Sequence, residues 1–362
     1  MRLMLDEGTD PRGPRNARFR TLLAVRVKLM TVAIMSWACG PGSEPSDDGL
    51  TRLRVVTQPY LVYAPLAVAW NEGYFSEQGL EVELVPMTGS ERALPLLVSG
   101  RVDVLPANPA PGFFNAIIRE QPIRIVSEVN RAGTAGCSPI SMLARPGLLE
   151  GTPTGAVPTV RRISVSKQAV MRYLAEHALA HVGVEMDSIQ LVDIPPAVRP
   201  DALASGAIDA ILAGEPFLTR TLETRKAARW VGVHEALPGT QFSFIFFGRR
   251  LLEQDRDAGE RFLAAYLRAL RELGEGKTPE NISLVARATG EDVALLSRMC
   301  WPFDRTDGRI NVESVLHFQE WAVEQRLLDE VVSAEDFWDP SFIDRAHRLL
   351  AGPGDESEEL DR

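Results

Sequence analysis

Apolar and polar positions alternate in short blocks along this chain, and one block occurs twice. Residues 97–110 and 203–216 each contain a Ser-Gly step, an Asp, a short apolar run and a loop rich in Pro, Gly or Asn. Gly supplies the left-handed cap of a helix, and the apolar run suits a strand covered on both faces. A Gly-apolar step and another strand-like run precede each copy, at 79–85 and 183–192. The pattern therefore predicts two similar α/β lobes with a ligand cleft between them.

Strand-like and helical patterns continue through both predicted lobes. The strands, read from short apolar runs, are expected at 53–57, 82–87, 102–105, 123–126, 162–165, 189–194 and 208–212. The helices, read from apolar residues three or four positions apart, are expected at 64–72, 90–100, 112–120, 167–182, 200–205 and 217–228. The chain is expected to cross between the lobes at 138–144 and again at 242–247.

The expected fold is therefore α/β and two-lobed, with a mostly parallel, helix-flanked sheet in each lobe. A chain of 362 residues with 45% hydrophobic content can bury a large core. The expected segments are a first lobe at 51–140, a second lobe at 141–238, a return to the first lobe with C-terminal helices at 239–350, and an acidic, disordered tail at 351–362.

The N-terminal segment has the pattern of an export signal. Several Arg and Lys residues precede an apolar run at 29–38, which has the length of a signal-peptide core. Cys39 and a polar, Gly-rich linker at 39–50 follow, and this arrangement resembles a bacterial lipoprotein. We expect a signal peptide at 1–38, lipidation of Cys39 and a periplasmic protein anchored to a membrane. The alternative is an ordinary exported protein that is cleaved nearby.

The net charge and the cysteines bear on three properties: nucleic-acid binding, metal binding and disulfide formation. The net charge of −10 argues against binding to nucleic acid. Cys137 and Cys300 are the other two cysteines, and their spacing is not that of a metal site. Export permits a disulfide between them. Because they lie far apart in the sequence, we expect two buried thiols instead.

Several phrases together resemble one known family. They are the helix from Tyr63 that leads through Glu-Gly-Tyr-Phe to Gly-Leu-Glu-Val, the two Ser-Gly-x-(Val/Ile)-Asp phrases, the Glu-Pro-Phe at 215–217, and the helical pattern at 310–321. In order and spacing they resemble the nitrate/sulfonate/taurine and thiamine-pyrimidine-precursor group of ABC-transporter substrate-binding proteins, which have the type II periplasmic binding fold. The resemblance covers residues 52–348.

The resemblance implies a monomeric binding protein without a cofactor. Such a protein would capture a small polar or anionic organic molecule, such as a sulfonate, a nitrate-like anion or a pyrimidine precursor. It would close its lobes on the ligand and deliver it to an ABC permease and its ATPase. A ligand-sensing module for a membrane receptor is the first alternative.

An enzyme of pyrimidine or vitamin-precursor metabolism on the same fold is the second alternative. The chain has no nucleophile elbow, phosphate-binding loop or dinucleotide-binding motif. It also lacks the clustered-cysteine motif of the eukaryotic pyrimidine-precursor synthases. His177 and His181 have the spacing of two metal ligands, but Gly183 is expected to end their helix, and we expect no metal site. Binding is therefore favoured over catalysis.

Loops that follow strands are expected to supply the ligand contacts. Tyr60 comes directly after the first strand, which favours a position facing the cleft. The turn before the second helix offers free N–H groups to an anion, and Ser90 is expected to be the N-cap. The amide of Asn108 can bind ligand or brace its turn. The first-lobe candidates are Gln58, Tyr60, Tyr63, Gly89, Ser90 and Asn108.

The second lobe offers a helix N-terminus and a carboxylate. Ser166, Lys167 and Gln168 occupy the stretch that holds an anion in sulfonate-binding relatives, although Gln168 stands where those relatives often have Gly. Lys167 would either neutralise an anion or lie in solvent. Glu215 would favour a ligand with a cationic or amine group.

Overall fold

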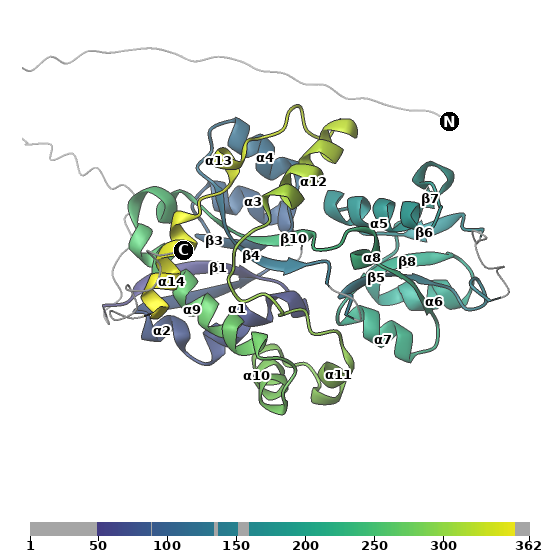
Figure 1. Cartoon of the computed structure of the whole chain (residues 1–362), viewed down its shortest axis with the longest axis horizontal. Coiled ribbons are helices and arrows are strands. Elements are labelled where there is room, and N and C mark those ends of the chain that lie inside the picture. The colour runs from purple at the N-terminus through teal and green to yellow at the C-terminus, as the bar shows by residue number, and fades with distance from the viewer. Residues whose placement is uncertain (1–48, 88, 134–136, 151–158, 352–362) are drawn as a thin grey trace, which may run out of the picture. The chain divides into compact units, whose positions relative to one another are not determined.

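The computed structural model describes residues 49–87, 89–133, 137–150 and 159–351 (Figure 1). They belong to one compact unit, Glu44–Arg362. The predicted signal peptide, Cys39, nearly all of the linker and the acidic tail after residue 351 lie outside the described residues.

The first sheet has five strands in the order β2-β1-β3-β10-β4. Strand β1 is parallel to β2 and β3, whereas β10 is antiparallel to β3 and β4. A strand from late in the sequence thus separates two early ones. The bounds are β1 Thr51–Thr57, β2 Leu80–Pro86, β3 Val104–Ala107, β4 Arg124–Arg131 and β10 Gln241–Phe247.

The second sheet repeats this arrangement in the order β7-β6-β8-β5-β9. Strand β6 is parallel to β7 and β8, and β5 is antiparallel to β8 and β9. The predicted pair of mostly parallel, helix-flanked sheets is therefore confirmed. The bounds are β5 Ile140–Ala144, β6 Arg162–Ser164, β7 Gln190–Leu191, β8 Ala210–Gly214 and β9 Ala228–Gly232.

Helices connect these strands and complete the C-terminal part. The α-helices up to β10 are α1 Ala64–Asn71, α2 Tyr74–Glu77, α3 Ser90–Val98, α4 Pro111–Ile118, α5 Ala169–His181, α6 Arg199–Ala204, α7 Phe217–Glu223 and α8 Val233–Ala236. The later ones are α9 Arg256–Gly274, α10 Pro279–Thr289, α11 Val293–Arg298, α12 Val312–Glu324, α13 Ala334–Phe337 and α14 Ser341–Ala351. Short 3-10 or π turns lie at η1 Leu61–Tyr63, η2 Met186–Ser188, η3 Pro196–Val198 and η4 Arg250–Gln254.

Strand β10 is at the centre of the first lobe's core. All seven of its residues are buried. On one face Phe246 stacks on Phe113 of α4, with 4.3 Å between ring centroids. On the other face Phe247 meets Phe262 of α9 and Phe342 of α14 edge-on. An uninterrupted apolar strand is what a sheet covered on both faces requires.

The aspartate in the repeated phrase has the same role in both lobes. Asp103 accepts a hydrogen bond from the backbone N–H of Arg54 at 2.8 Å. Asp209 accepts from the N–H groups of Arg161 and Arg162 at 2.9 and 3.0 Å. In each lobe the carboxylate that precedes the third strand thus binds backbone N–H groups of the first strand or of the residue before it. The repeat therefore encodes strand pairing.

Several predicted element boundaries were wrong. The two expected crossing segments are mostly strands inside the sheets, β5 and β10, because their apolar side chains are buried there. The chain instead passes between the sheets after β4 and after β9. Helix α7 ends at Glu223, and the residues expected to continue it lead into β9. The strand expected at 189–194 has only two residues because it lies at a sheet edge, with both side chains exposed.

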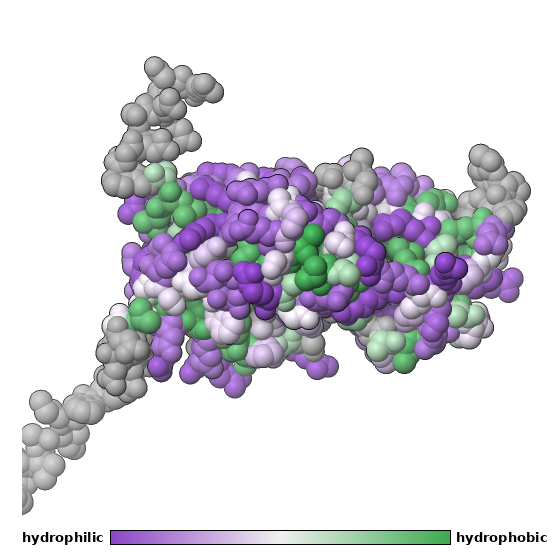
Figure 2. Space-filling view, turned by 90° about the horizontal axis from the view of Figure 1, so that it is seen from below, coloured by the Kyte–Doolittle hydropathy of each residue, from purple (hydrophilic) through white to green (hydrophobic). Residues whose placement is uncertain are grey.

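On the face shown in Figure 2, hydrophobic residues form small patches within a mainly hydrophilic surface. None of the helices in the described part of the chain is both long enough and apolar enough to cross a membrane.

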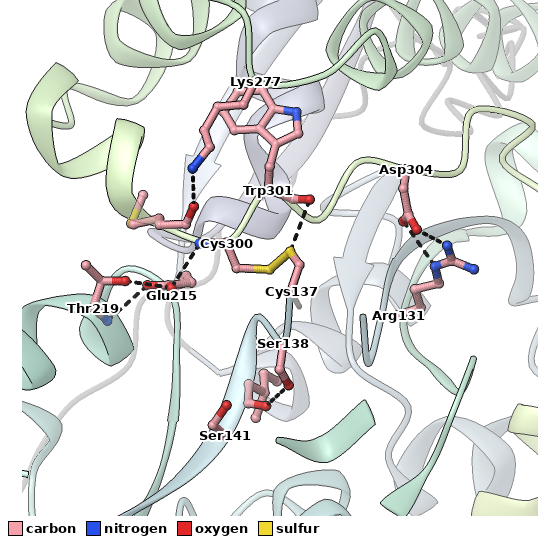
Figure 3. The surroundings of a disulfide bond; sticks show 12 residues. Arg131, Cys137, Ser138, Ser141, Glu215, Thr219, Lys277, Cys300, Trp301 and Asp304 are labelled. Carbon is pink, nitrogen blue, oxygen red and sulfur yellow. Dashed lines mark hydrogen bonds and ion pairs between the residues drawn. A yellow bond between two sulfur atoms is a disulfide. The ribbon is translucent and has the colours of Figure 1, made fainter. Parts of the chain in front are cut away.

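Cys137 and Cys300 form a disulfide (Figure 3). The expectation of two buried thiols was therefore wrong. The half-cystines are separated by 163 residues in the sequence, but their Cα atoms lie 5.1 Å apart. The C-terminal helices return the chain to the segment that follows β4, which sequence distance does not reveal. The bond ties this crossing segment to the residues after α11.

Candidate functional site

A cavity of about 140 Å³ lies where loops of the two sheets meet. We call it the inner cavity. From the first sheet, residues after β1, after β3 and within β10 contribute to it. From the second sheet, residues within β5 and β8 and after β6 contribute. Its lining includes seven of the sequence-predicted residues: Gln58, Tyr60, Tyr63, Asn108, Ser166, Gln168 and Glu215.

A hydrogen-bond network fixes the first-lobe wall of the inner cavity. Gln58 Nε2 donates to Tyr63 Oη at 3.2 Å and to the carbonyl of Pro106 at 3.0 Å. Ser243 Oγ of β10 also donates to Tyr63 Oη at 3.2 Å. Burial raises the pKa of Tyr63 far above its usual value, so the side chain stays a neutral phenol. This wall is therefore preorganised and uncharged.

Two amides meet across the inner cavity. Asn108 Nδ2, after β3, donates to Gln168 Oε1, which precedes α5, at 3.3 Å. Gly89 faces the same side chain, since a Cβ added there would lie 4.0 Å from Gln168 Nε2. The structure thus brings Gly89, Asn108 and Gln168 together. Ser90 is the first residue of α3, and Gly89 is the N-cap, so the expected capping role of Ser90 was wrong.

Lys167 lies away from the inner cavity. Its Nζ is 2.7 Å from Asp193 Oδ2, and the two side chains are 80% and 63% exposed. Such an exposed pair contributes at most about 1 kcal/mol. Of the two interpretations that the sequence allowed for Lys167, the structure agrees with the solvated lysine.

Glu215 lines the inner cavity, but its carboxylate is bound by the protein itself (Figure 3). Thr219 donates from Oγ1 at 2.7 Å and from its backbone N at 3.1 Å. The N–H of Cys300 donates at 3.3 Å. Burial raises the pKa of Glu215 above its usual value, although these hydrogen bonds act in the opposite direction. The carboxylate connects α7 to the half-cystine of the C-terminal region.

Arg199 is the functional candidate that the sequence prediction missed. It lines the inner cavity, is 9% exposed, and donates from Nε to the carbonyl of Ile194 at 2.9 Å. Burial lowers its pKa, but a guanidinium keeps its charge in proteins. A signal was present, because Arg199 begins α6, directly after the loop that follows β7. That strand corresponds to β2, whose loop was expected to face the cleft.

Aromatic rings form the outer wall of the inner cavity. Tyr60 is 38% exposed, and its ring lies edge-on to Phe217 of α7 with 6.4 Å between centroids. The ring also lies 6.5 Å from that of Tyr63. This wall joins a first-lobe loop to a second-lobe helix.

The described residues include no group of three or more His, Cys, Asp or Glu side chains that could hold a metal ion. The Nδ1 of His177 instead lies 2.9 Å from the carbonyl of Tyr173.

The sequence matches the model of the NMT1-like family over residues 46–289. The chain belongs to the NMT1-like family. The match includes all ten strands of the two described sheets and all of the lining of the inner cavity. No curated protein matches the sequence.

Solved structures share the fold of this NMT1-like protein. One is the alkanesulfonate-binding protein SsuA from Xanthomonas axonopodis pv. citri bound to MOPS, at 19% identity and a TM-score of 0.64, with 80% of this chain and 98% of that chain covered. Another is the nitrate-binding protein NrtA from Synechocystis PCC 6803, at 13% identity and a TM-score of 0.63, with 85% of this chain and 91% of that chain covered. A third is the desulfurization enzyme DszB, at 16% identity and a TM-score of 0.63, with 83% of this chain and 99% of that chain covered.

Proposed function

We propose that this NMT1-like protein is an exported solute-binding protein that captures a small organic anion between its lobes. It would deliver the anion to an ABC permease and its ATPase. One observation carries the proposal: a buried, positively charged side chain, Arg199, faces a cavity to which both lobes contribute. Fold relatives named as sulfonate-binding and nitrate-binding proteins support an anion as ligand.

The charge of Arg199 favours an anionic ligand. Within the described residues, no carboxylate lies within ion-pair distance of its guanidinium. Arg199 donates to the Ile194 carbonyl, and the negative charge of Asp193 also acts on it. A buried charge without an ion-pair partner still costs free energy, and an anion in the inner cavity would offset that cost. The amides of Asn108 and Gln168 and the hydroxyl of Ser166 line the same cavity and supply neutral hydrogen-bonding groups.

The apolar lining favours an organic molecule over a bare inorganic ion. Met171, Ile211, Phe217 and Phe242 all contact the inner cavity. These side chains can bury a hydrocarbon chain or ring of the ligand, and a small hydrated ion has no such apolar part to bury. A sulfonate is therefore our first choice, ahead of a nitrate-like anion or a pyrimidine precursor.

Closure of the lobes would follow from where the ligand binds. A molecule held by Arg199 and by the loop after β3 contacts both lobes, so it binds the closed form better and shifts the population toward it. The segments after β4 and β9, where the chain crosses between the sheets, are the proposed hinges.

Binding to Arg199 is tested by isothermal titration calorimetry with short alkanesulfonates. Arg199→Gln removes a charged hydrogen-bonding group, so its affinity should fall at least tenfold. The matched control is Arg119→Gln, which changes an exposed arginine at the end of α4 and should bind like the wild type. Equal affinity in Arg199→Gln and the wild type would contradict the anion site.

The location of the protein is tested separately. We propose that Cys39 is lipidated and that the protein lies in the periplasm, attached to a membrane. Cys39→Ala should then move the protein from the membrane fraction to the soluble periplasmic fraction. A wild-type protein that is already soluble would contradict the anchor but not the binding role.

Catalysis is the second candidate, because DszB has the same fold. Cys137 and Cys300 are bonded to each other and therefore offer no thiol nucleophile. We favour binding for this reason. Recovery of an unchanged ligand after long incubation, measured by mass spectrometry, is the expected result, whereas a product would favour the enzyme.

A further inference from the structure

A second, larger cavity adjoins the inner one. This outer cavity has a volume of about 510 Å³, against about 140 Å³ for the inner cavity. Gln58, Tyr60 and Tyr63 line both, so the two cavities meet at these side chains. A ligand that passes the Tyr60 ring would occupy both.

The outer cavity is lined mainly by apolar side chains. Trp70 is 49% exposed there, and its indole Nε1 donates to the carbonyl of Val82 at 3.0 Å, which holds the ring against the edge strand β2. Ala67, Leu84 and Met87 continue the surface beside it. Apolar area of this kind next to a ligand site is a surface that a ligand can cover.

Charge is distributed unequally between the cavities. The charged residue of the outer lining is Glu291, and its carboxylate lies 2.5 Å from Arg220 Nη2, which neutralises it. The cation of the inner cavity, Arg199, makes no such ion pair among the described residues. An elongated molecule would therefore bind with its negative end inward and its apolar end outward.

We infer that the ligand is an elongated organic anion, with its charged group near Arg199 in the inner cavity and its hydrocarbon or aromatic tail on Trp70 and Met87 in the outer cavity. The inference rests on the proposed function and adds the class of ligand. Tyr60 would contact the middle of the molecule, because it lines both cavities.

The experiment compares tail lengths. The probes are linear alkanesulfonates and alkanecarboxylates with one to eight carbons, titrated by calorimetry below their micelle concentrations. Affinity should rise roughly threefold to fourfold for each methylene that leaves water for the outer cavity. A single short member that binds best, with longer tails excluded or neutral, would overturn the inference.

Variants separate the tail site from the head-group site. Trp70→Ala and Met87→Ala should each weaken the longest probe at least tenfold and leave the shortest unchanged. Arg199→Gln should weaken all lengths by the same factor. Leu191→Ala, which removes a 48% exposed leucine from the remote strand β7, is the matched control and should change nothing.

Failure of the tail site and failure of the proposed function would give different results. Binding of short probes that depends on Arg199, with no effect of tail length or of Trp70 and Met87, would overturn the tail site and leave the proposed function intact. No binding of any probe by the folded wild type, checked by its far-UV spectrum, would overturn both.

Discussion

The role of each buried carboxylate in this protein depends on its surroundings. Asp103 and Asp209 bind backbone N–H groups at equivalent places in the two lobes. Glu128 is buried among side chains instead, and Glu215 binds a helix and a half-cystine. The two aspartates were visible in the sequence because they repeat. The two glutamates also have partners from distant segments, Gln241 for Glu128 and Cys300 for Glu215, which the local sequence does not reveal.

Asp209 should stabilise the second lobe at neutral pH. Burial alone would raise its pKa, but the N–H groups of Arg161 and Arg162, with Arg145, outweigh burial and lower it. A lowered pKa means that the contribution is present above the unfolded-state pKa and is lost as pH falls through the folded-state value.

Asp209→Asn should therefore reduce the free energy of unfolding by about 1–3 kcal/mol at pH 7. In urea titrations the difference from the wild type should shrink below about pH 4. Asp193→Asn, at an exposed site, is the control and should differ little at either pH. A deficit in Asp209→Asn that is constant from pH 3 to 7 would contradict the role of the charge.

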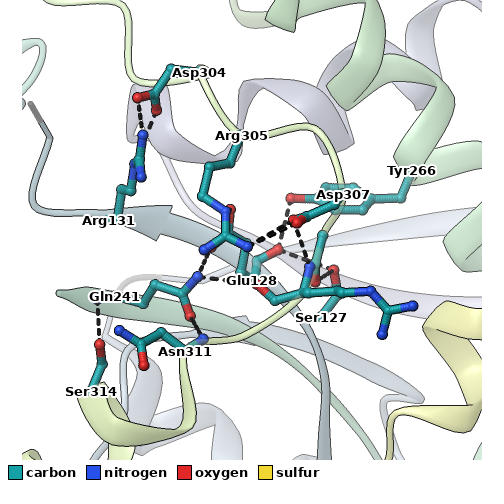
Figure 4. Close-up of polar contacts among 12 residues, drawn as sticks. Ser127, Glu128, Arg131, Gln241, Tyr266, Asp304, Arg305, Asp307, Asn311 and Ser314 are labelled. Carbon is teal, nitrogen blue, oxygen red and sulfur yellow. Dashed lines mark hydrogen bonds and ion pairs between the residues drawn. The ribbon is translucent and has the colours of Figure 1, made fainter. Parts of the chain in front are cut away.

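The contribution of Glu128 to stability should have the opposite pH dependence and decrease as pH rises (Figure 4). Gln241 Nε2 donates to its carboxylate, and Arg305 Nε lies 3.9 Å away. Burial raises the pKa of Glu128 to about 8; of the charged neighbours, Arg305 and Arg131 lower it, whereas Asp307 and Asp304 raise it. A raised pKa gives stability that is full below the unfolded-state pKa and is lost as pH rises through the folded-state value.

The wild type should thus lose stability between about pH 4.5 and pH 8 through this group. Glu128→Gln cannot ionise, so its free energy of unfolding relative to the wild type should increase over that interval. Denaturant titrations at four pH values measure the difference. A constant difference between the two proteins would show that Glu128 does not titrate in this range.

At the scale of elements, burial explains which predictions were correct. Short runs that are almost entirely buried, such as β3 and β8, were predicted as strands because nearly every residue in them is apolar. Strand β9 was missed because its first two residues, Ala228 and Arg229, are exposed and resemble the end of a helix. Arg199 was missed for a related reason, since an arginine at a helix start is usually solvated. Its burial depends on the second lobe's tertiary packing.

Strand β10 should be the most sensitive element of the first lobe. Phe246 is fully buried and stacks on Phe113, so Phe246→Ala should cost about 3–5 kcal/mol of unfolding free energy. Leu191→Ala on the exposed edge strand β7 should cost no more than about 0.5 kcal/mol. Guanidinium titrations followed by circular dichroism compare them, and similar midpoints would contradict the central position of β10.

At the scale of the whole described unit, the C-terminal helices contact both lobes. Helix α12 packs on β10 and on α5, where Trp321 Nε1 donates to Glu176 at 3.3 Å. Helix α11 packs on α7, beside the ion pairs of Arg298 with Glu223 and Arg220 with Glu291. Any closure of the lobes must preserve or exchange these contacts. Local sequence patterns contain no information about such pairings.

The disulfide should stabilise this arrangement. A variant with both Cys137→Ser and Cys300→Ser should lose about 2–4 kcal/mol of unfolding free energy, since the bond closes a long loop in the unfolded chain. A reducing agent should destabilise the wild type by a similar amount and leave the double variant unchanged. If oxidised wild type and double variant unfold at the same denaturant concentration, the bond contributes no stability.

The position of β10 between β3 and β4 imposes an order on folding. The second sheet is built from one continuous stretch, 140–232, so all of its strands exist before β10 has been synthesised. The first sheet lacks an interior strand until Phe247 is available, and β4 has no neighbour in that sheet until then. The first lobe therefore starts earlier in the sequence than the second lobe but is completed after it. Until β10 is available, the edges of β3 and β4 are unpaired, and a nascent chain would be vulnerable to mispairing there.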